Sequence, residues 1–110
     1  MDGGPGSGRY PKGSGGNVDP ELVKQFTDRL VGVKSASGVT VNSISNHAMR
    51  RLAQRDISVD TADNLNRHAP IIYPGNTPDT ICQQKDDFRM VINKKTGNIV
   101  SFVRLDEMEE

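Results

Sequence analysis

Three residues between positions 47 and 55 have the types and the spacing of an anion-binding site. His47, Arg51 and Arg55 follow one another at intervals of four residues, so on a helix all three side chains project from one face. Positive groups on one face repel each other unless an anion lies between them, and guanidinium binds phosphate through two parallel hydrogen bonds. A histidine that titrates near neutral pH beside this phosphate has the chemistry to move a proton to or from a ribose hydroxyl. By itself the spacing favours a plainer alternative, a solvated helix face whose charges pair with Asp60 or Asp63.

Helical signals precede every strong strand signal along the chain. Asp19 and Ser58 are N-cap residue types, as are Ser45 and Asn46, and apolar residues recur at helical spacing after the first of them. Pro70 disfavours helical geometry at the residue before it. These features predict three helices, from Pro20 to a stop at Gly32, from Ser45 or Asn46 to about Arg55, and from Val59 to about Arg67.

Strand signals dominate after residue 70. Runs rich in β-branched and aromatic residues are separated by turn residues, and residues 94–98 have the composition of a tight hairpin turn. The predicted strands cover residues 71–73, 80–84, 88–93 and 99–104, and a shorter β-prone run covers 39–41. Helices followed by an antiparallel meander predict an α+β domain, with the N-terminal helices packed on a four-stranded antiparallel sheet.

Composition predicts one domain with tails. The chain has 110 residues and equal numbers of basic and acidic residues, 14 of each. Residues 1–17 are rich in glycine and are expected to be a disordered tail, residues 18–105 a single domain, and residues 106–110 an acidic tail. Because four acidic residues lie in residues 105–110, residues 1–104 carry 14 basic and 10 acidic residues, a net charge of +4. A basic surface is therefore compatible with the neutral total.

The sequence has no apolar stretch of the roughly 20 residues that a membrane span requires. The glycine-rich N-terminus also lacks the apolar region of a signal peptide. The expected location is the cytoplasm of a host or target cell, or a virion, without contact with a membrane.

Two segments resemble the same nuclease superfamily. Residues 44–58, ISNHAMRRLAQRDIS, resemble a pattern of the form S-x-H-A-x-x-R-(M/L)-x-x-R-G-(I/V)-(S/T), and residues 91–103, VINKKTGNIVSFV, are similar to a closing V-I-N-x-x-T-G-x-I-V hairpin. Both patterns belong to nuclease domains at the C-terminal ends of bacterial polymorphic and contact-dependent toxins, in the barnase–EndoU–colicin E5/D–RelE superfamily. The resemblance extends from about residue 39 to 105 and implies the same order of helices and strands.

The resemblance implies metal-independent RNA cleavage, often of tRNA. In that reaction the 2′-hydroxyl attacks the adjacent phosphate and leaves a 2′,3′-cyclic phosphate and a 5′-hydroxyl end. Carried over by position, His47 would be the general base or acid, Arg51 would stabilise the phosphorane, and Arg55 would hold the phosphate or brace the fold. Ser101 lies where the closing strand often carries a hydroxyl and would donate a hydrogen bond to a phosphate oxygen. No metal or cofactor is implied.

Further cations are expected to contact the RNA backbone, because the chain has few aromatic residues for base stacking. They are Arg50, Arg67, Arg89, Lys94, Lys95 and Arg104. Tyr73 and Lys85 are weaker candidates for a second proton donor or a phosphate contact, and Thr96 is expected only to shape its turn.

Departures from the pattern favour a second interpretation. Asp56 replaces the usual glycine, where its carboxylate could pair with Arg55, and the second acid or base is not evident; His68 is better suited to a helix C-terminus than to catalysis. The glycine-rich residues 3–15 resemble a segment of phage minor head (head-morphogenesis) proteins. The alternative is therefore a catalytically inactive phage-associated module of the same fold, used for binding or virion assembly.

Expected partners follow from these interpretations. They are RNA, an immunity protein or phage head proteins, and the chain is expected to be a monomer. A third hypothesis makes the helix within residues 18–32 an oligomerisation or docking element.

Other chemistries have less support in the sequence. A zinc site needs about four ligands at close spacing, which Cys82, His47 and His68 do not supply. Asp86 and Asp87 fall in a predicted turn, where solvation is the simpler expectation than two-metal catalysis. Cys82 has no neighbouring base in the sequence and is expected to be a buried strand cysteine.

Overall fold

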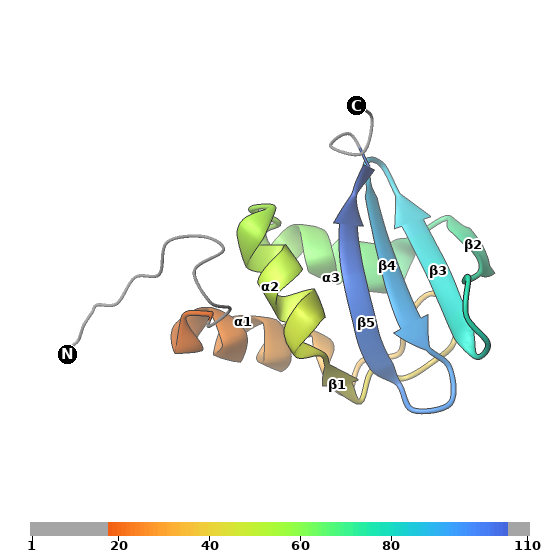
Figure 1. Ribbon diagram of the computed structural model, residues 1–110, viewed down its shortest axis with the longest axis horizontal. Coiled ribbons are helices and arrows are strands. Elements are labelled where there is room, and N and C mark those ends of the chain that lie inside the picture. The colour runs from red at the N-terminus through yellow and green to blue at the C-terminus, as the bar shows by residue number, and fades with distance from the viewer. Residues whose placement is uncertain (1–17, 106–110) are drawn as a thin grey trace.

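Three helices lie on one face of a five-stranded sheet in the computed structural model, which describes residues 18–105 (Figure 1). The helices are α1 (Pro20–Leu30), α2 (Asn46–Gln54) and α3 (Val59–His68), and the strands are β1 (Ser43–Ile44), β2 (Ile71–Pro74), β3 (Thr80–Lys85), β4 (Phe88–Asn93) and β5 (Asn98–Arg104). The α+β class predicted from the sequence is confirmed. The predicted tails at residues 1–17 and 106–110 lie outside the described residues.

Each helix begins at a side chain that satisfies free backbone N–H groups. Asp19 accepts from the N–H of Glu21, Ser45 from that of Ala48, and Ser58 from that of Thr61. These caps confirm the three predicted helix starts. Gly32 follows α1 with a φ of +88°, the left-handed conformation that suits a chain leaving a helix.

The predicted four-stranded antiparallel sheet was incomplete. The strand order is β1-β5-β4-β3-β2, and β1 pairs with β5 in parallel, so the sheet is mixed. Within the β-prone run at residues 39–41, Thr40 forms only an isolated bridge with Lys34. The strand β1 begins two residues after this run and consists of Ser43 and Ile44. A parallel partner for β5 requires a long-range connection, which the local sequence pattern does not reveal.

The turn between β4 and β5 allows β1 to approach. Asn93 accepts hydrogen bonds from the N–H groups of Lys95 and Thr96, and Thr96 accepts one from the N–H of Asn98. Gly97 has a φ of +74°, and a Cβ there would lie 2.5 Å from the carbonyl oxygen of Thr40. A side chain at position 97 would therefore displace the segment that leads into β1, and Thr96 has the turn role expected of it.

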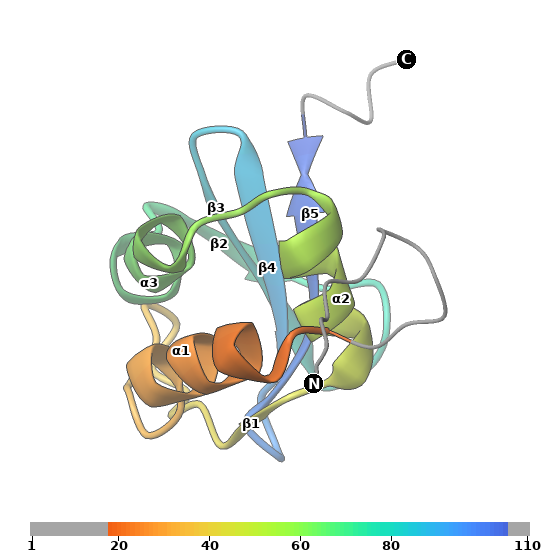
Figure 2. The ribbon, with the colours of Figure 1, turned by 90° about the vertical axis from the view of Figure 1, so that its left-hand side faces the viewer.

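The core lies between the helices and one face of the sheet (Figure 2). Alternate residues of β4, Met90 and Ile92, are fully buried there, together with Ile99 and Phe102 of β5. Phe26 and Leu30 of α1 are also fully buried, so part of the apolar stripe proposed for oligomerisation packs inside the domain. None of the helices within residues 18–105 is long and apolar enough to cross a membrane.

Gln83 joins three segments inside this core. Its side chain is fully buried, and its amide nitrogen donates to the carbonyl oxygens of Leu65 and Asn66 at 3.1 and 3.0 Å. Its amide oxygen accepts from the N–H of Ser37 at 3.1 Å. These hydrogen bonds attach the C-terminal turn of α3 and the loop after α1 to β3. Loss of any of them would leave a buried polar group of the amide without a partner, which is costly in free energy.

Candidate phosphate-binding site

Ser45 fixes the start of α2 on the edge of β5. Its backbone N–H donates to the carbonyl oxygen of Ile99 at 2.9 Å, and its hydroxyl donates to that of Val100 at 2.9 Å. The same hydroxyl accepts from the N–H of Ala48 at 3.0 Å, which makes Ser45 both the N-cap and the link to the sheet. One face of α2, with Ala48, Met49 and Leu52, is then buried against the core. On the opposite face His47 is exposed, and Arg50, Arg51 and Gln54 are half-buried.

That outward face of α2 carries a histidine and an arginine in direct contact. The Nε of Arg51 donates to Nε2 of His47 at 3.4 Å, and Nη1 of Arg51 donates to Oε1 of Gln54 at 2.9 Å. Because Nε2 of His47 accepts a hydrogen bond, the proton of the neutral imidazole is assigned to Nδ1. His47 and Arg51 thus lie on one face of α2, as their spacing predicts, whereas their direct contact and the bond to Gln54 were not predicted from the sequence.

The surroundings of His47 favour its neutral form. Partial burial lowers the pKa of His47 below the ordinary value of 6.5, and the positive charges of Arg51, Arg50 and Arg55 lower it further. The neutral form of His47 therefore predominates at neutral pH in the free protein. An uncharged imidazole is the form that accepts a proton from a hydroxyl.

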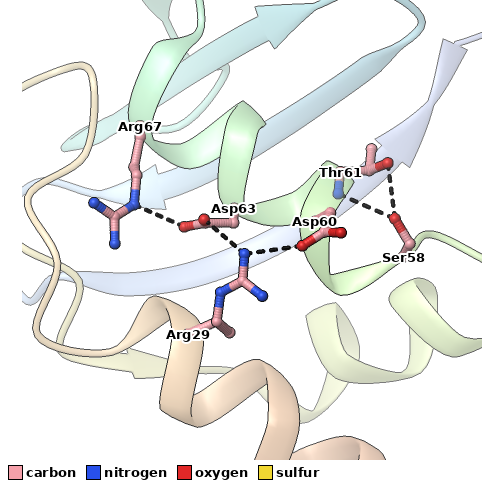
Figure 3. Close-up of polar contacts among 6 residues, drawn as sticks. All are labelled: Arg29, Ser58, Asp60, Thr61, Asp63 and Arg67. Carbon is pink, nitrogen blue, oxygen red and sulfur yellow. Dashed lines mark hydrogen bonds and ion pairs between the residues drawn. The ribbon is translucent and has the colours of Figure 1, made fainter.

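Asp60 and Asp63 make their ion pairs elsewhere, with arginines of α1 and α3 (Figure 3). Nη2 of Arg29 lies 3.0 Å from Asp60 and 2.9 Å from Asp63, and Nε of Arg67 lies 2.8 Å from Asp63. Neither carboxylate pairs with Arg51. The plain alternative, in which these acids neutralise the α2 face, therefore does not describe the contacts of the His47–Arg51 pair.

The C-terminus of α2 ends in a Schellman motif around Asp56. The N–H of Ile57 bonds to the carbonyl oxygen of Leu52 at 3.0 Å, and that of Asp56 bonds to Ala53 at 3.3 Å. Asp56 has a φ of +54°, the conformation in which glycine is preferred. The glycine of the nuclease pattern thus has a structural explanation at this position, and the aspartate adopts the same conformation.

Arg55 closes α2 next to β5. Its carbonyl oxygen accepts from Nη1 of Arg104 at 2.9 Å, so a β5 cation lies at the negative end of the α2 dipole. The Arg104 guanidinium also lies 5.7 Å from the centre of the Phe88 ring. These contacts involve the backbone of Arg55, and the two roles expected for its side chain stay predictions.

Ser101 lies on the other face of the sheet from the helices. It pairs with Val91, whose neighbours Met90 and Ile92 point into the core, so Val91 and Ser101 face away from it. The structure contains no hydrogen bond between Ser101 and His47 within residues 18–105. The two residues that the resemblance brings together are therefore on different surfaces of the domain.

The same outer sheet face brings Tyr73 and Arg89 together. Nη1 of Arg89 donates to the Tyr73 hydroxyl at 3.2 Å, and this hydroxyl donates to Oε1 of Gln84 at 3.1 Å. Arg89 was predicted as an RNA contact and Tyr73 as a weaker candidate. Their proximity depends on the pairing of β2 with β3 and of β3 with β4, and no local motif indicates it.

The remaining predicted RNA contacts are dispersed. Lys94 and Lys95 lie in the β4–β5 turn, where Nζ of Lys95 lies 3.7 Å from Asp79, and Arg67 is held by Asp63 on α3. Arg50 lies on α2 and makes no ion pair with any residue between 18 and 105. Of the predicted contacts, Arg50 is therefore the one that shares the helix of His47 and Arg51.

Two further properties bear on the chemistry. Residues 18–105 contain no group of three or more His, Cys, Asp or Glu side chains placed to hold a metal ion. Cys82 is a buried free cysteine on β3, which confirms the burial expected for it.

Comparison of the chain with family models, with curated proteins and with solved structures gave no match. The nuclease and phage head resemblances stay predictions.

Proposed function

We propose that the chain is a metal-independent endoribonuclease domain that binds an RNA phosphodiester on the outward face of α2. The observation that carries the proposal is the contact between Arg51 and a neutral His47. A base and a phosphate-binding cation are thereby adjacent, and neither is paired with Asp60 or Asp63.

In this proposal His47 accepts the proton of the ribose 2′-hydroxyl, whose oxygen attacks the adjacent phosphorus. Arg51 stabilises the negative charge on the phosphorane oxygens, an electrostatic contribution of about 10²–10³ in rate. The bond to the 5′-oxygen then breaks, and the proton held by His47 can pass to that leaving oxygen. The products are a 2′,3′-cyclic phosphate and a 5′-hydroxyl, and tRNA is the proposed substrate class.

Arg50 supplies a further phosphate contact in this proposal. It lies on the same helix as Arg51 and has no acidic partner within the described range 18–105. An RNA backbone carries successive phosphates, so neighbouring cations on one helix suit it better than a single anion. The toxin or phage origin of the domain, an immunity partner and a cytoplasmic or virion location belong to the same proposal.

A second candidate function is an inactive binding or virion-structural module of the same fold. Two observations favour it: the base nitrogen of His47 is occupied by Arg51, and Ser101 lies on the other sheet face. Such a module would still bind a phosphodiester through α2 but would not cleave it.

Binding and cleavage of a labelled single-stranded RNA separate these functions. Arg51→Ala is expected to weaken binding about tenfold, corresponding to about 1.4 kcal/mol for one charge-assisted contact, and to reduce the cleavage rate at saturating RNA by about 10²–10³. Lys24→Ala, on the exposed side of α1, removes a cation without altering α2 and serves as the control. Equal affinity and equal cleavage in the two variants would contradict the proposed site. Weaker binding by Arg51→Ala, together with no cleavage by the parent protein, would support the binding module.

A further inference from the structure

We infer that Arg51 masks the base nitrogen of His47 in the free protein, that Gln54 positions Arg51 for this purpose, and that a bound phosphodiester removes the mask. This inference rests on the proposed function and gives it a substrate-dependent step. Gln54 accepts a hydrogen bond from Arg51, and no hydrogen bond joins it to His47 within residues 18–105, so it acts in this inference as a positioning residue.

The hydrogen bonds of the Arg51 guanidinium have unequal lengths. The bond to Oε1 of Gln54 is 2.9 Å, whereas the contact with Nε2 of His47 is 3.4 Å, longer than the roughly 2.7–3.2 Å typical of N–H donors. Gln54 is therefore the firmer attachment, and it holds the guanidinium over the imidazole. Within an α-helix, residues three and four positions apart are neighbours, which is why Arg51 meets both His47 and Gln54.

A phosphodiester is a stronger acceptor for Arg51 than the neutral imidazole. The guanidinium is a charged donor in both cases, but the phosphate adds an opposite charge and presents two oxygens to the guanidinium fork, which binds it bidentately. When the Nε–H of Arg51 turns to a phosphate oxygen, Nε2 of His47 is left with a free lone pair. The base therefore becomes active only when the substrate is bound beside it.

Within residues 18–105, the charged groups that shift the pKa of His47 are all basic, so none of them mimics the phosphate. They are Arg50 and Arg51 of α2 and Arg55, the C-cap residue of this helix. On β5, the strand against which α2 packs, the one ionisable residue is Arg104, and it bonds to the carbonyl oxygen of Arg55 at the other end of the helix. No residue of β5 therefore supplies a negative charge that would draw Arg51 away from His47.

The test is an NMR titration of the two histidines in the full chain without RNA, with His47→Ala used for assignment and His68 as an internal reference. Gln54→Ala is expected to raise the pKa of His47 toward 6.5. It should also weaken the correlation between the Arg51 Nε–H and the His47 ring. Gln54→Glu keeps the acceptor and should retain this correlation, while its charge raises the pKa of His47. Gln25→Ala, on the exposed part of α1, should change neither.

Addition of the deoxydinucleotide TpT, which has a phosphodiester but no 2′-hydroxyl, completes the test. It should shift the Arg51 Nε–H signal and the His47 Nε2 signal together in the parent protein. The change at His47 Nε2 should be smaller in Gln54→Ala. An unchanged pKa of His47 in Gln54→Ala, or an Arg51 signal that does not respond to bound TpT, would overturn the inference. These readouts do not involve RNA cleavage. A protein without nuclease activity can therefore show the contact between Arg51 and His47 and its release by TpT, and a protein with nuclease activity can lack them.

Discussion

His47 is the residue on which the chemistry of this domain depends in our account. Its neutral state is favoured by partial burial and by three nearby arginines, Arg50 and Arg51 of α2 and the C-cap residue Arg55. A lowered pKa means that the folded protein disfavours protonation of His47. The associated stability is present above the ordinary pKa and is lost as the pH falls through the folded value.

The activity should follow the same titration. If His47 is the general base, kcat/KM rises with pH and levels off above the pKa of the free protein, which lies below 6.5. Arg51→Gln removes a nearby positive charge and should move the midpoint of this rise to higher pH, besides lowering the plateau. A pH–rate profile of RNA cleavage measures both effects. The same midpoint in the parent and in Arg51→Gln would show that Arg51 does not influence the titrating group.

Asp56 offers a test at a single backbone position. Since its φ of +54° suits glycine, Asp56→Gly is expected to raise the free energy of unfolding by about 0.5 kcal/mol, and Asp56→Val to lower it by about 1–2 kcal/mol. Urea denaturation measures the two differences. Equal stability of the two variants would show that α2 does not end in the Schellman motif described above.

The sequence pattern grouped only those site residues that are neighbours along one helix. His47, Arg51 and Arg55 could be grouped from the sequence because helical spacing is local. Gln54 was missed because an uncharged side chain carries no signal of its own, and the pairing of Tyr73 with Arg89 requires the register of three strands. The position of Ser101 away from His47 likewise depends on which sheet face the helices cover.

At the scale of elements, local capping was sufficient to predict where the helices start. Asp19, Ser45 and Ser58 each cap the helix that follows, because these contacts involve neighbouring residues. The two-residue strand β1 was not predicted. Its pairing with β5 joins residues 55 positions apart, so its existence depends on the folded arrangement and not on its own composition.

The packing of α1 on α3 depends on the ionisation of Asp63. Burial opposes its ionisation, but hydrogen bonds from Arg29 and Arg67 outweigh this effect and lower the pKa of Asp63 below the ordinary 3.8. The stabilisation is present above that value and is lost as the pH falls through the folded pKa. Asp63→Asn should therefore reduce the free energy of unfolding by about 1–2 kcal/mol at pH 7, with a smaller difference near pH 2.

Thermal or urea unfolding at the two pH values tests this ion-pair cluster. Asp28→Asn is the matched control, since Asp28 pairs with Lys24 one turn away on α1 and is well exposed. Its expected effect is about 0.5 kcal/mol or less. A cost of Asp63→Asn that is the same at both pH values would contradict the role of ionisation.

At the scale of the whole molecule, a zero net charge does not describe the surface of α2. The chain has 14 basic and 14 acidic residues, yet Asp60 and Asp63 are occupied by arginines of other helices. The helix α2 contains two arginines and no acidic residue, so charge is unevenly distributed along a neutral chain, as the proposed binding of a polyanion requires.

The most direct test of the central claim is incubation of the purified protein with total tRNA in EDTA, beside His47→Ala and the control His68→Ala. The account predicts cleavage by the parent and by His68→Ala, with 2′,3′-cyclic phosphate ends, and a rate about 10²–10⁴ lower for His47→Ala. Absence of cleavage by the parent, or equal cleavage by His47→Ala, would contradict it.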